Sequence, residues 1–170
     1  MCIVSFIFPL FQHKRQAYYA VYYMFQYFAQ AMTAFITCVM AKKHFKRPRP
    51  SVKNVPKRYF NIRGKEIDCS WPSGDTAQSG IFALFLWQNM YDLVIRIPGG
   101  MGWYLLFFWV LHVAFGRIFF HCHYIGDTIG GYLVAWFVAH VNTFVTNVLV
   151  LWRQIQCIEL INKILPRWDK

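Results

Sequence analysis

Acidic side chains are scarce in this chain of 170 residues, which has seven Asp and Glu against 18 Lys and Arg and a formal net charge of +11. Such a basic balance indicates an anionic partner: nucleic acid, anionic lipid or an anionic substrate. Most of the cations lie between long apolar blocks, and no nucleic-acid-binding motif is present. We therefore expect membrane and substrate contacts and no nucleic acid partner.

Metal-binding and targeting motifs are missing as well. The five cysteines follow no zinc-ligand spacing, so we expect neither a metal nor another cofactor. The apolar stretch Met1–Gln12 lacks a basic region and a small-residue cleavage site, and it does not fit a signal peptide. Without internal repeats or low-complexity segments, residues 1–170 are expected to form one domain.

Apolar sequence is what the chain has in abundance: 57% of its residues are hydrophobic and 20% are aromatic. Long apolar blocks of this kind predict membrane-spanning helices. The blocks are Gln16–Ala41, Thr76–Ile97, Met101–Phe120 and Thr128–Leu151, with a tight return at Pro98-Gly99-Gly100. We predict an all-α, polytopic membrane bundle of about four transmembrane helices.

Two shorter apolar elements flank these blocks. Met1–Phe11 is too short to cross a membrane alone, so we interpret it as an N-terminal stub that is an interfacial anchor or the remainder of earlier spans. The tail, Trp152–Lys170, has apolar residues at a three-to-four spacing. This spacing predicts an amphipathic helix on the membrane interface, with a soluble partner-binding helix as the competing interpretation.

His140 is a polar residue inside the fourth block. Intramembrane histidines act in proton relays or make hydrogen bonds with neighbouring helices. We favour the hydrogen bond.

Three short polar clusters lie at the edges of the apolar blocks. They comprise Lys42 with Arg49-Pro50, then Pro72-Ser73-Gly74-Asp75, and finally Arg117 with His123 and Asp127. Four membrane crossings place all three clusters on the same side. Cations, a glycine-opened helix start and an imidazole at one membrane depth are what phosphoryl transfer through a histidine requires.

The cations of these clusters suit a phosphate ligand. Lys42, Arg49 and Arg117 offer fixed positive charge, and an arginine fork matches phosphate oxygens. The competing interpretation is a solvated basic loop over Lys42–Trp71, which holds ten Lys or Arg, or contact with anionic lipid headgroups. Free backbone N–H groups after Ser73 and Gly74 also bind anions, although helix capping by Ser73 or Asp75 explains the same residues.

His123 is the candidate nucleophile because a neutral imidazole attacks phosphorus to form a phosphohistidine. Asp127 lies four residues later, one helical turn away, where it is placed to hold the other ring nitrogen. The alternative makes His123 an interfacial aromatic residue and Asp127 the N-cap of the fourth helix. The presence of Arg117 and of two further clusters favours the functional interpretation.

These residues resemble the type 2 phosphatidic acid phosphatase and vanadium haloperoxidase superfamily. Its pattern has Lys, six residues and Arg-Pro, then Pro-Ser-Gly-His, then Ser-Arg, five residues, His, three residues and Asp. The matching positions are Lys42, Arg49, Pro50, Pro72, Ser73, Gly74, Arg117, His123 and Asp127. The resemblance implies that Lys42, Arg49, Ser73, Gly74 and Arg117 bind phosphate, that His123 attacks it and that Asp127 orients His123.

Two positions depart from this pattern. Gly116 replaces a serine, and Asp75 replaces the histidine that the family uses to protonate the leaving group. An ionised Asp75 does not donate a proton and repels phosphate, whereas burial that raised its pKa would let it act as the acid. Otherwise His44 or His121 acts as the acid, a diphosphate leaves without one, or activity is lost.

The predicted function is an integral, multi-pass membrane phosphatase of an endomembrane or plasma membrane. It is expected to hydrolyse lipid phosphate monoesters or diphosphates through a phosphohistidine. A catalytically impaired lipid-phosphate binder is the alternative that Asp75 suggests. A vanadate-dependent haloperoxidase is disfavoured by the membrane spans, because that class of enzyme is soluble.

Overall fold

Five α-helices and one 3₁₀ turn account for the part of the chain that the structure, a computed structural model, describes. Backbone is described for residues 2–51 and 69–164, and side chains for 21–51, 69–91 and 94–157. The elements are α1 (Cys2–Phe45), α2 (Gly74–Asn89), α3 (Tyr91–Ile95), η2 (Pro98–Gly100), α4 (Met101–Phe119) and α5 (Ile125–Ile164). The described residues contain no strand, and the predicted all-α fold is confirmed.

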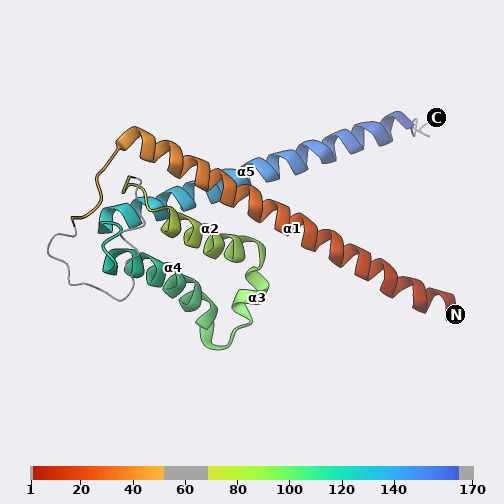
Figure 1. Cartoon of the computed structure of the whole chain (residues 1–170). Helices are drawn as coiled ribbons and strands as arrows, with labels where there is room; N and C mark the ends of the chain where they lie inside the picture. Colours follow the sequence, from red (N-terminus) through yellow and green to blue (C-terminus); the bar gives the residue numbers. More distant parts are fainter. Residues whose placement is uncertain (1, 52–68, 165–170) are drawn as a thin grey trace.

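The long helices α1 and α5 cross one another and diverge toward the two termini (Figure 1). Helix α2 contacts α1, α4 and α5 and is therefore the central element of the bundle. The end of α1, the start of α2, the end of α4 and the start of α5 gather at the same end of the molecule (Figure 1). The three polar clusters lie on these helix ends and on the segments that join them.

Three helical segments are long and apolar enough to cross a membrane: Val21–Phe45, Pro98–Phe119 and Ile125–Cys157. They correspond to the first, third and fourth predicted blocks, and the protein is a helical membrane bundle. Helix α2 has 16 residues, or about 24 Å at 1.5 Å per residue, whereas the hydrocarbon core is about 30 Å thick. Its central position surrounds it with protein rather than lipid on most sides.

The second predicted block, Thr76–Ile97, is not one continuous helix. Helix α2 ends at Asn89, and the short α3 follows after Met90. Met90 between them has φ of −127° and ψ of 32°, which lies outside the helical range. The tight return is confirmed at η2, where Gly99 and Gly100 both have φ of 69°, a conformation that favours glycine.

The sequence predicted separate elements at the two ends of the chain, but both ends continue the long helices. The stub Met1–Phe11 belongs to α1 from Cys2 onward, because residues 12–16 contain neither glycine nor proline to interrupt the helix. The tail Trp152–Lys170 likewise continues α5 as far as Ile164. Residues 165–170 lie outside the described part of the chain.

Small side chains allow the helices to pack closely at the centre of the bundle. The buried core consists of Ala34, Ile81, Ala135, Val138 and Ala139, from α1, α2 and α5. A Cβ atom on Gly80 of α2 would lie only 2.7 Å from that of Ala135. Membrane helices associate through such small-residue contacts, because lipid offers no hydrophobic driving force between them. This packing fixes the start of α2 against the start of α5.

Candidate functional site

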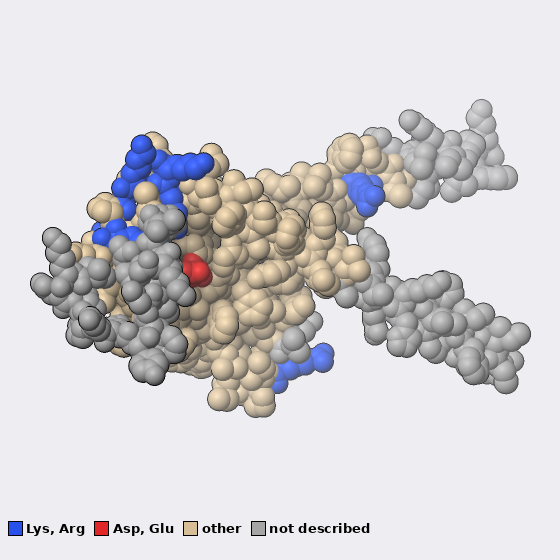
Figure 2. Space-filling view, viewed as in Figure 1, with Lys and Arg blue, Asp and Glu red and all other residues tan. Residues whose placement is uncertain are grey.

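The candidate site lies where four helix ends meet. Lys and Arg side chains gather at this end of the molecule (Figure 2). They include Lys42, Lys43, Lys46, Arg47 and Arg49, at the end of α1 and on the segment that follows it. The middle of the basic loop, residues 52–68, lies outside the described residues. The described cations therefore come from the ends of that loop and from α4.

His123 is held in a tight turn between α4 and α5. The carbonyl of Arg117 accepts hydrogen bonds from the backbone N–H groups of Cys122, at 3.0 Å, and of His123, at 3.3 Å. The side chain of His123 is 3% exposed. Burial excludes the interfacial aromatic residue that was the alternative interpretation of His123.

Arg49 contacts the imidazole of His123 directly. Its Nη1 atom lies 3.2 Å from Nε2 of His123 and also donates to the carbonyl of Cys122 at 2.8 Å. A guanidinium only donates, so Nε2 must be the unprotonated ring nitrogen in this contact. The proton of the neutral ring then lies on Nδ1, and the lone pair of Nε2 points at the cation.

The surroundings of His123 keep its ring neutral. Burial is the largest cause, followed by the positive charges of Arg49 and Arg117, and together they lower the pKa of His123 from 6.5 to about 4. The backbone of Ser70 and the carboxylate of Asp127 act in the opposite direction but are weaker. At neutral pH the imidazole therefore has the charge state that a nucleophile needs.

Asp127 is fully buried and lies next to the same ring. Its Oδ2 atom is 3.8 Å from Nδ1 of His123, which is close enough for an ion pair but too long for a hydrogen bond. Nδ1 is buried and has no hydrogen-bond partner among the described residues. Catalytic hydrogen bonds are often long in unliganded sites and shorten when substrate binds. The orienting role of Asp127 stays a prediction.

Asp127 also organises the start of α5, although not as its N-cap. It is the third residue of the helix, and Oδ2 accepts the backbone N–H of Tyr124 at 2.8 Å. Its own N–H donates to the carbonyl of Tyr124 at 3.0 Å. The bond from the N–H of Tyr124 to the carboxylate is the carboxylate half of a capping box, and the N–H of Asp127 bonds to backbone instead. The carboxylate thus serves the fold as well as the candidate site.

Ser73 and Gly74 open α2 beside this turn. The hydroxyl of Ser73 accepts the N–H of Thr76 at 3.4 Å, so Ser73 is the N-cap of α2, as the capping interpretation predicted. The N–H of Ser73 donates to the carbonyl of Asp127 at 2.9 Å and joins the second and third clusters. A Cβ atom on Gly74 would meet nothing within 4 Å, which leaves open space over the helix start.

Gly131 makes this junction between α2 and α5 possible. A Cβ atom at that position would collide with the carbonyl oxygen of Ser73 and would lie 3.2 Å from the N–H nitrogen of Ala77. Any larger residue would therefore push the start of α2 away from α5. The site depends on this close approach because Ser73 and Asp127 come from the two helices.

Arg117 and Asp75 form an ion pair at the edge of the site. Nε of Arg117 lies 2.9 Å from Oδ2 of Asp75, and the two side chains are 17% and 57% exposed. Asp75 is not buried, so the burial that would make it a proton donor is not found. Arg117, which the sequence assigned to phosphate, is therefore paired with the carboxylate of Asp75.

Lys42 lies at the end of α1, ahead of Arg47 and Arg49 in the chain. Lys42 is in the last turn of α1, and its carbonyl accepts the N–H of Lys46 at 3.1 Å. The described contacts that join this end of the bundle to His123 and Asp127 come from Arg49 and from Arg47. Phosphate binding by Lys42 stays a prediction.

Two residues of the site were missed from the sequence. Nη1 of Arg47 pairs with Oδ1 of Asp127 at 2.8 Å, and its guanidinium lies 4.6 Å from the centre of the Tyr124 ring. The hydroxyl of Ser70 donates to Oδ2 of Asp127. Arg47 had a signal, because residues 47–50 read Arg-Pro-Arg-Pro and each proline keeps the preceding arginine extended. Ser70 had none.

The family comparison agrees with this arrangement of residues. The chain matches the family model of the PAP2 superfamily over residues 15–151. That range contains all three clusters and every helix that forms the site. Neither the curated proteins nor the solved structures give a significant match to the chain.

Proposed function

The chain belongs to the PAP2 superfamily, and from this membership and the site geometry we propose that it is a multi-pass membrane phosphatase that forms a phosphohistidine. Its proposed substrates are lipid phosphate monoesters or diphosphates, in an endomembrane or the plasma membrane. One observation carries the proposal: a buried, neutral His123 has its Nε2 lone pair directed at Arg49, within the field of Arg117.

The first step is binding of the phosphate. The guanidinium groups of Arg49 and Arg117 donate hydrogen bonds to its oxygens. Lys42 and the open helix start at Gly74 are further donors. When Arg49 turns to the phosphate, the lone pair of Nε2 is released for attack. The cation that masks the nucleophile in the empty site thus becomes part of the phosphate site.

The second step is transfer of the phosphoryl group. Nε2 of His123 forms a bond to phosphorus while the bond from phosphorus to the leaving oxygen breaks. The ring becomes cationic, and Asp127 stabilises it once Nδ1 closes the 3.8 Å gap. Water then attacks phosphorus and the P–N bond breaks. Inorganic phosphate and a proton are released, and the neutral ring is restored.

The leaving group requires its own explanation, because Asp75 is exposed and paired with Arg117. A lipid alkoxide needs a proton, which must come from water or a nearby histidine. A diphosphate instead expels a phosphate, which is stable as an anion and needs no acid. We therefore propose that diphosphates are turned over faster than monoesters.

Phosphate release from purified protein in detergent micelles tests the proposal. The substrates are phosphatidate, lysophosphatidate and a polyprenyl diphosphate, without added metal. We expect His123→Ala to lower turnover at least about a thousandfold, since the covalent route is lost. His112→Ala, an exposed histidine of α4, is the matched control and should retain activity. Equal phosphate release by wild type and His123→Ala would show that His123 is not the nucleophile.

The second candidate function, lipid-phosphate binding without turnover, is favoured by the Asp75–Arg117 ion pair. The same substrate panel distinguishes it. Binding of the lipids with no His123-dependent release of phosphate would establish the binder. Quenching the reaction in alkali with radiolabelled substrate would detect the phosphohistidine, which acid destroys and alkali preserves.

A further inference from the structure

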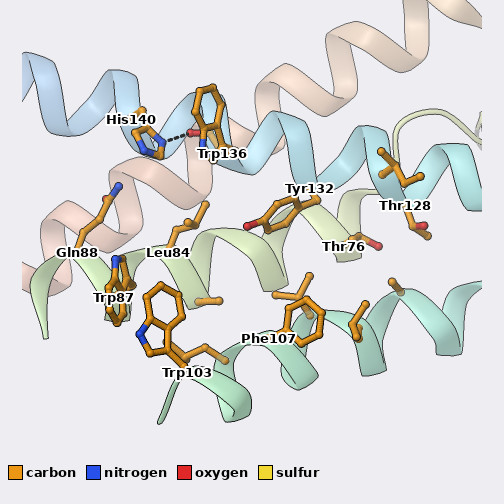
Figure 3. A pocket seen from close by; sticks show the side chains of 16 residues that line it. Thr76, Leu84, Trp87, Gln88, Trp103, Phe107, Thr128, Tyr132, Trp136 and His140 are labelled. Carbon is orange, nitrogen blue, oxygen red and sulfur yellow. Dashed lines mark hydrogen bonds between the residues drawn. The ribbon is translucent and has the colours of Figure 1, made fainter. Parts of the chain in front are cut away.

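A cavity of about 600 Å³ lies between α2, α4 and α5. Helix α2 forms its floor, and side chains from α4 and α5 form two facing walls (Figure 3). Most of the lining is apolar, and its aromatic members are Trp87, Trp103, Phe107, Tyr132 and Trp136. The volume is that of an ordinary small-molecule pocket. The walls belong to helices apolar enough to cross a membrane.

One end of the cavity adjoins the candidate phosphate site. Thr76 and Thr128 line that end (Figure 3). The hydroxyl of Thr76 is 3.0 Å from that of Ser73, the N-cap of α2, and Thr128 directly follows Asp127 in the chain. A ligand in the cavity would therefore have one end beside the proposed phosphate and the other among aromatic rings. An amphiphile with an anionic head group and an apolar tail fits this arrangement.

The cavity is about as deep as one leaflet of a bilayer. Its lining on α2 runs from Thr76 to Gln88, which is about 18 Å at 1.5 Å per residue. Half of a hydrocarbon core of about 30 Å is about 15 Å. One extended hydrocarbon chain from the leaflet on the site side matches this depth.

The far end of the cavity carries two polar side chains, Gln88 and His140, beside the rings of Trp87 and Trp103 (Figure 3). Gln88 accepts a hydrogen bond from the hydroxyl of Thr143 at 3.0 Å. His140 donates from Nδ1 to the carbonyl of Trp136 at 2.7 Å, within its own helix and not to a neighbouring helix as the sequence suggested. A hydrocarbon chain that reached this end would cover the remaining polar atoms of these side chains without offering them a hydrogen bond, which is unfavourable. The polar end therefore opposes longer chains.

We propose that this cavity binds one hydrocarbon chain of the lipid substrate and that the Gln88–His140 end limits its length. The identity of the head group rests on the proposed function. Helix α4 contacts α2 more extensively than it contacts α5, so the gap between α4 and α5 is the entrance from the bilayer. No residue of α1 lines the cavity among the described residues.

The energetic role of the cavity is to position the substrate. The lipid bilayer is as apolar as the cavity, so transfer of a chain between them contributes little hydrophobic free energy. Packing against the rings and a fixed head-group depth contribute instead, and correct positioning strongly accelerates reactions. Chain selection should therefore appear in kcat/KM and be moderate in size.

Two neighbouring leucines provide the decisive test. Leu106 lines the cavity, whereas Leu105 is 57% exposed on the outer face of α4. Leu106→Trp should lower kcat/KM about tenfold for palmitoyl lysophosphatidate and leave the octanoyl substrate nearly unchanged, because only the longer chain meets the added ring. Leu105→Trp, the same change one residue away, should change neither. An equal effect of both variants at every chain length would overturn the proposal.

The length limit has its own pair of variants. Gln88→Leu makes the far end apolar and should move the preferred chain from palmitoyl toward behenoyl. Thr143→Val removes the same hydrogen bond but does not line the cavity, so it should leave the preference unchanged. An unchanged preference in Gln88→Leu would overturn the length limit.

Occupancy can be measured without turnover. The full chain in nanodiscs is irradiated with a lysophosphatidate that carries a diazirine at the end of a palmitoyl chain. Labelling of Trp87 or Trp103 that Leu106→Trp abolishes and Leu105→Trp preserves would support the proposal even if no substrate were hydrolysed. Labelling confined to Leu105 and the outer face of α4 would overturn it. If the protein can be cross-linked as a dimer and the cavity of that dimer is not labelled, a second copy of the chain covers the cavity and the proposal is overturned.

Discussion

The two sides of the candidate site each hold one carboxylate, and the fold treats them differently. Asp127, on the inner side, is fully buried and is held by Arg47, by the hydroxyl of Ser70 and by the N–H of Tyr124. Asp75, on the outer side, is more than half exposed and pairs with Arg117. The inner carboxylate is fixed before substrate arrives, whereas the outer one can be exchanged.

Within this one cluster of charges, we expect the buried carboxylate to matter for stability and the exposed one to matter for ligand binding. Buried ion pairs with several hydrogen bonds are costly to break, and exposed pairs contribute little to stability. Under the proposed function, an arriving phosphate would therefore displace Asp75 from Arg117 but not Asp127 from Arg47.

Replacing the inner carboxylate should have the largest effect. Asp127→Asn loses the charge that pairs with Arg47 and that faces Nδ1 of His123, so we expect a loss of at least about a hundredfold in kcat. We also expect a loss of about 2 kcal/mol of unfolding free energy, reduced because Arg47 is partly exposed. Phosphate release and thermal unfolding in detergent measure the two effects. Asp75→Asn should unfold like wild type; equal destabilisation by both would remove the distinction.

The pH profile tests whether the inner cations keep His123 neutral. With a pKa of about 4, the ring is neutral above that pH and is protonated, and unable to attack, below it. The acid limb of kcat/KM should therefore lie near pH 4. Arg49→Gln removes one of the positive charges, so the pKa of His123 should rise and the acid limb should move toward neutrality. Lys43→Gln, at an exposed cation nearby, should leave the limb in place; a fixed limb in Arg49→Gln would contradict the assignment.

Removing the outer carboxylate should strengthen anion binding. Asp75→Asn removes the carboxylate charge that pairs with Arg117, so vanadate and inorganic phosphate should inhibit about tenfold more strongly. Asp75→Glu keeps the charge and should behave like wild type. Asp75→His should additionally raise turnover of monoesters more than of diphosphates, since only the monoester lacks a good leaving group. Unchanged inhibition in Asp75→Asn would mean that Arg117 does not receive the phosphate.

The smallest effect is expected from the hydroxyl of Ser70, which donates to the inner carboxylate. Ser70→Ala should lower the unfolding free energy by about 1.5 kcal/mol, because hydrogen bonds to charged groups contribute more than neutral ones. Ser79→Ala is the matched control: its hydroxyl donates at 2.9 Å to the carbonyl of Thr76, a neutral acceptor. A smaller loss is expected there. Thermal unfolding of both variants makes the comparison, and a larger loss in Ser79→Ala would contradict it.

The helix positions were predictable because each long apolar block needs internal hydrogen bonds in lipid. The ends of the helices were less predictable. The stub before Gln16 and the tail after Leu151 merged with α1 and α5, since an unbroken backbone continues a helix whether or not its side chains are apolar. The break lies at Met90, whose φ of −127° is outside the helical range, and the sequence pattern did not predict it.

The sequence by itself determined the membrane-helix fold, the three clusters and their meeting at one end of the bundle, because alternating crossings return the chain to the same side. Only the tertiary structure decided what each charged group touches. It paired Arg47 with Asp127, Arg49 with His123 and Arg117 with Asp75. Spacing along a chain fixes which residues are near, whereas burial and the directions of side chains from four separate helix ends fix which of them bond.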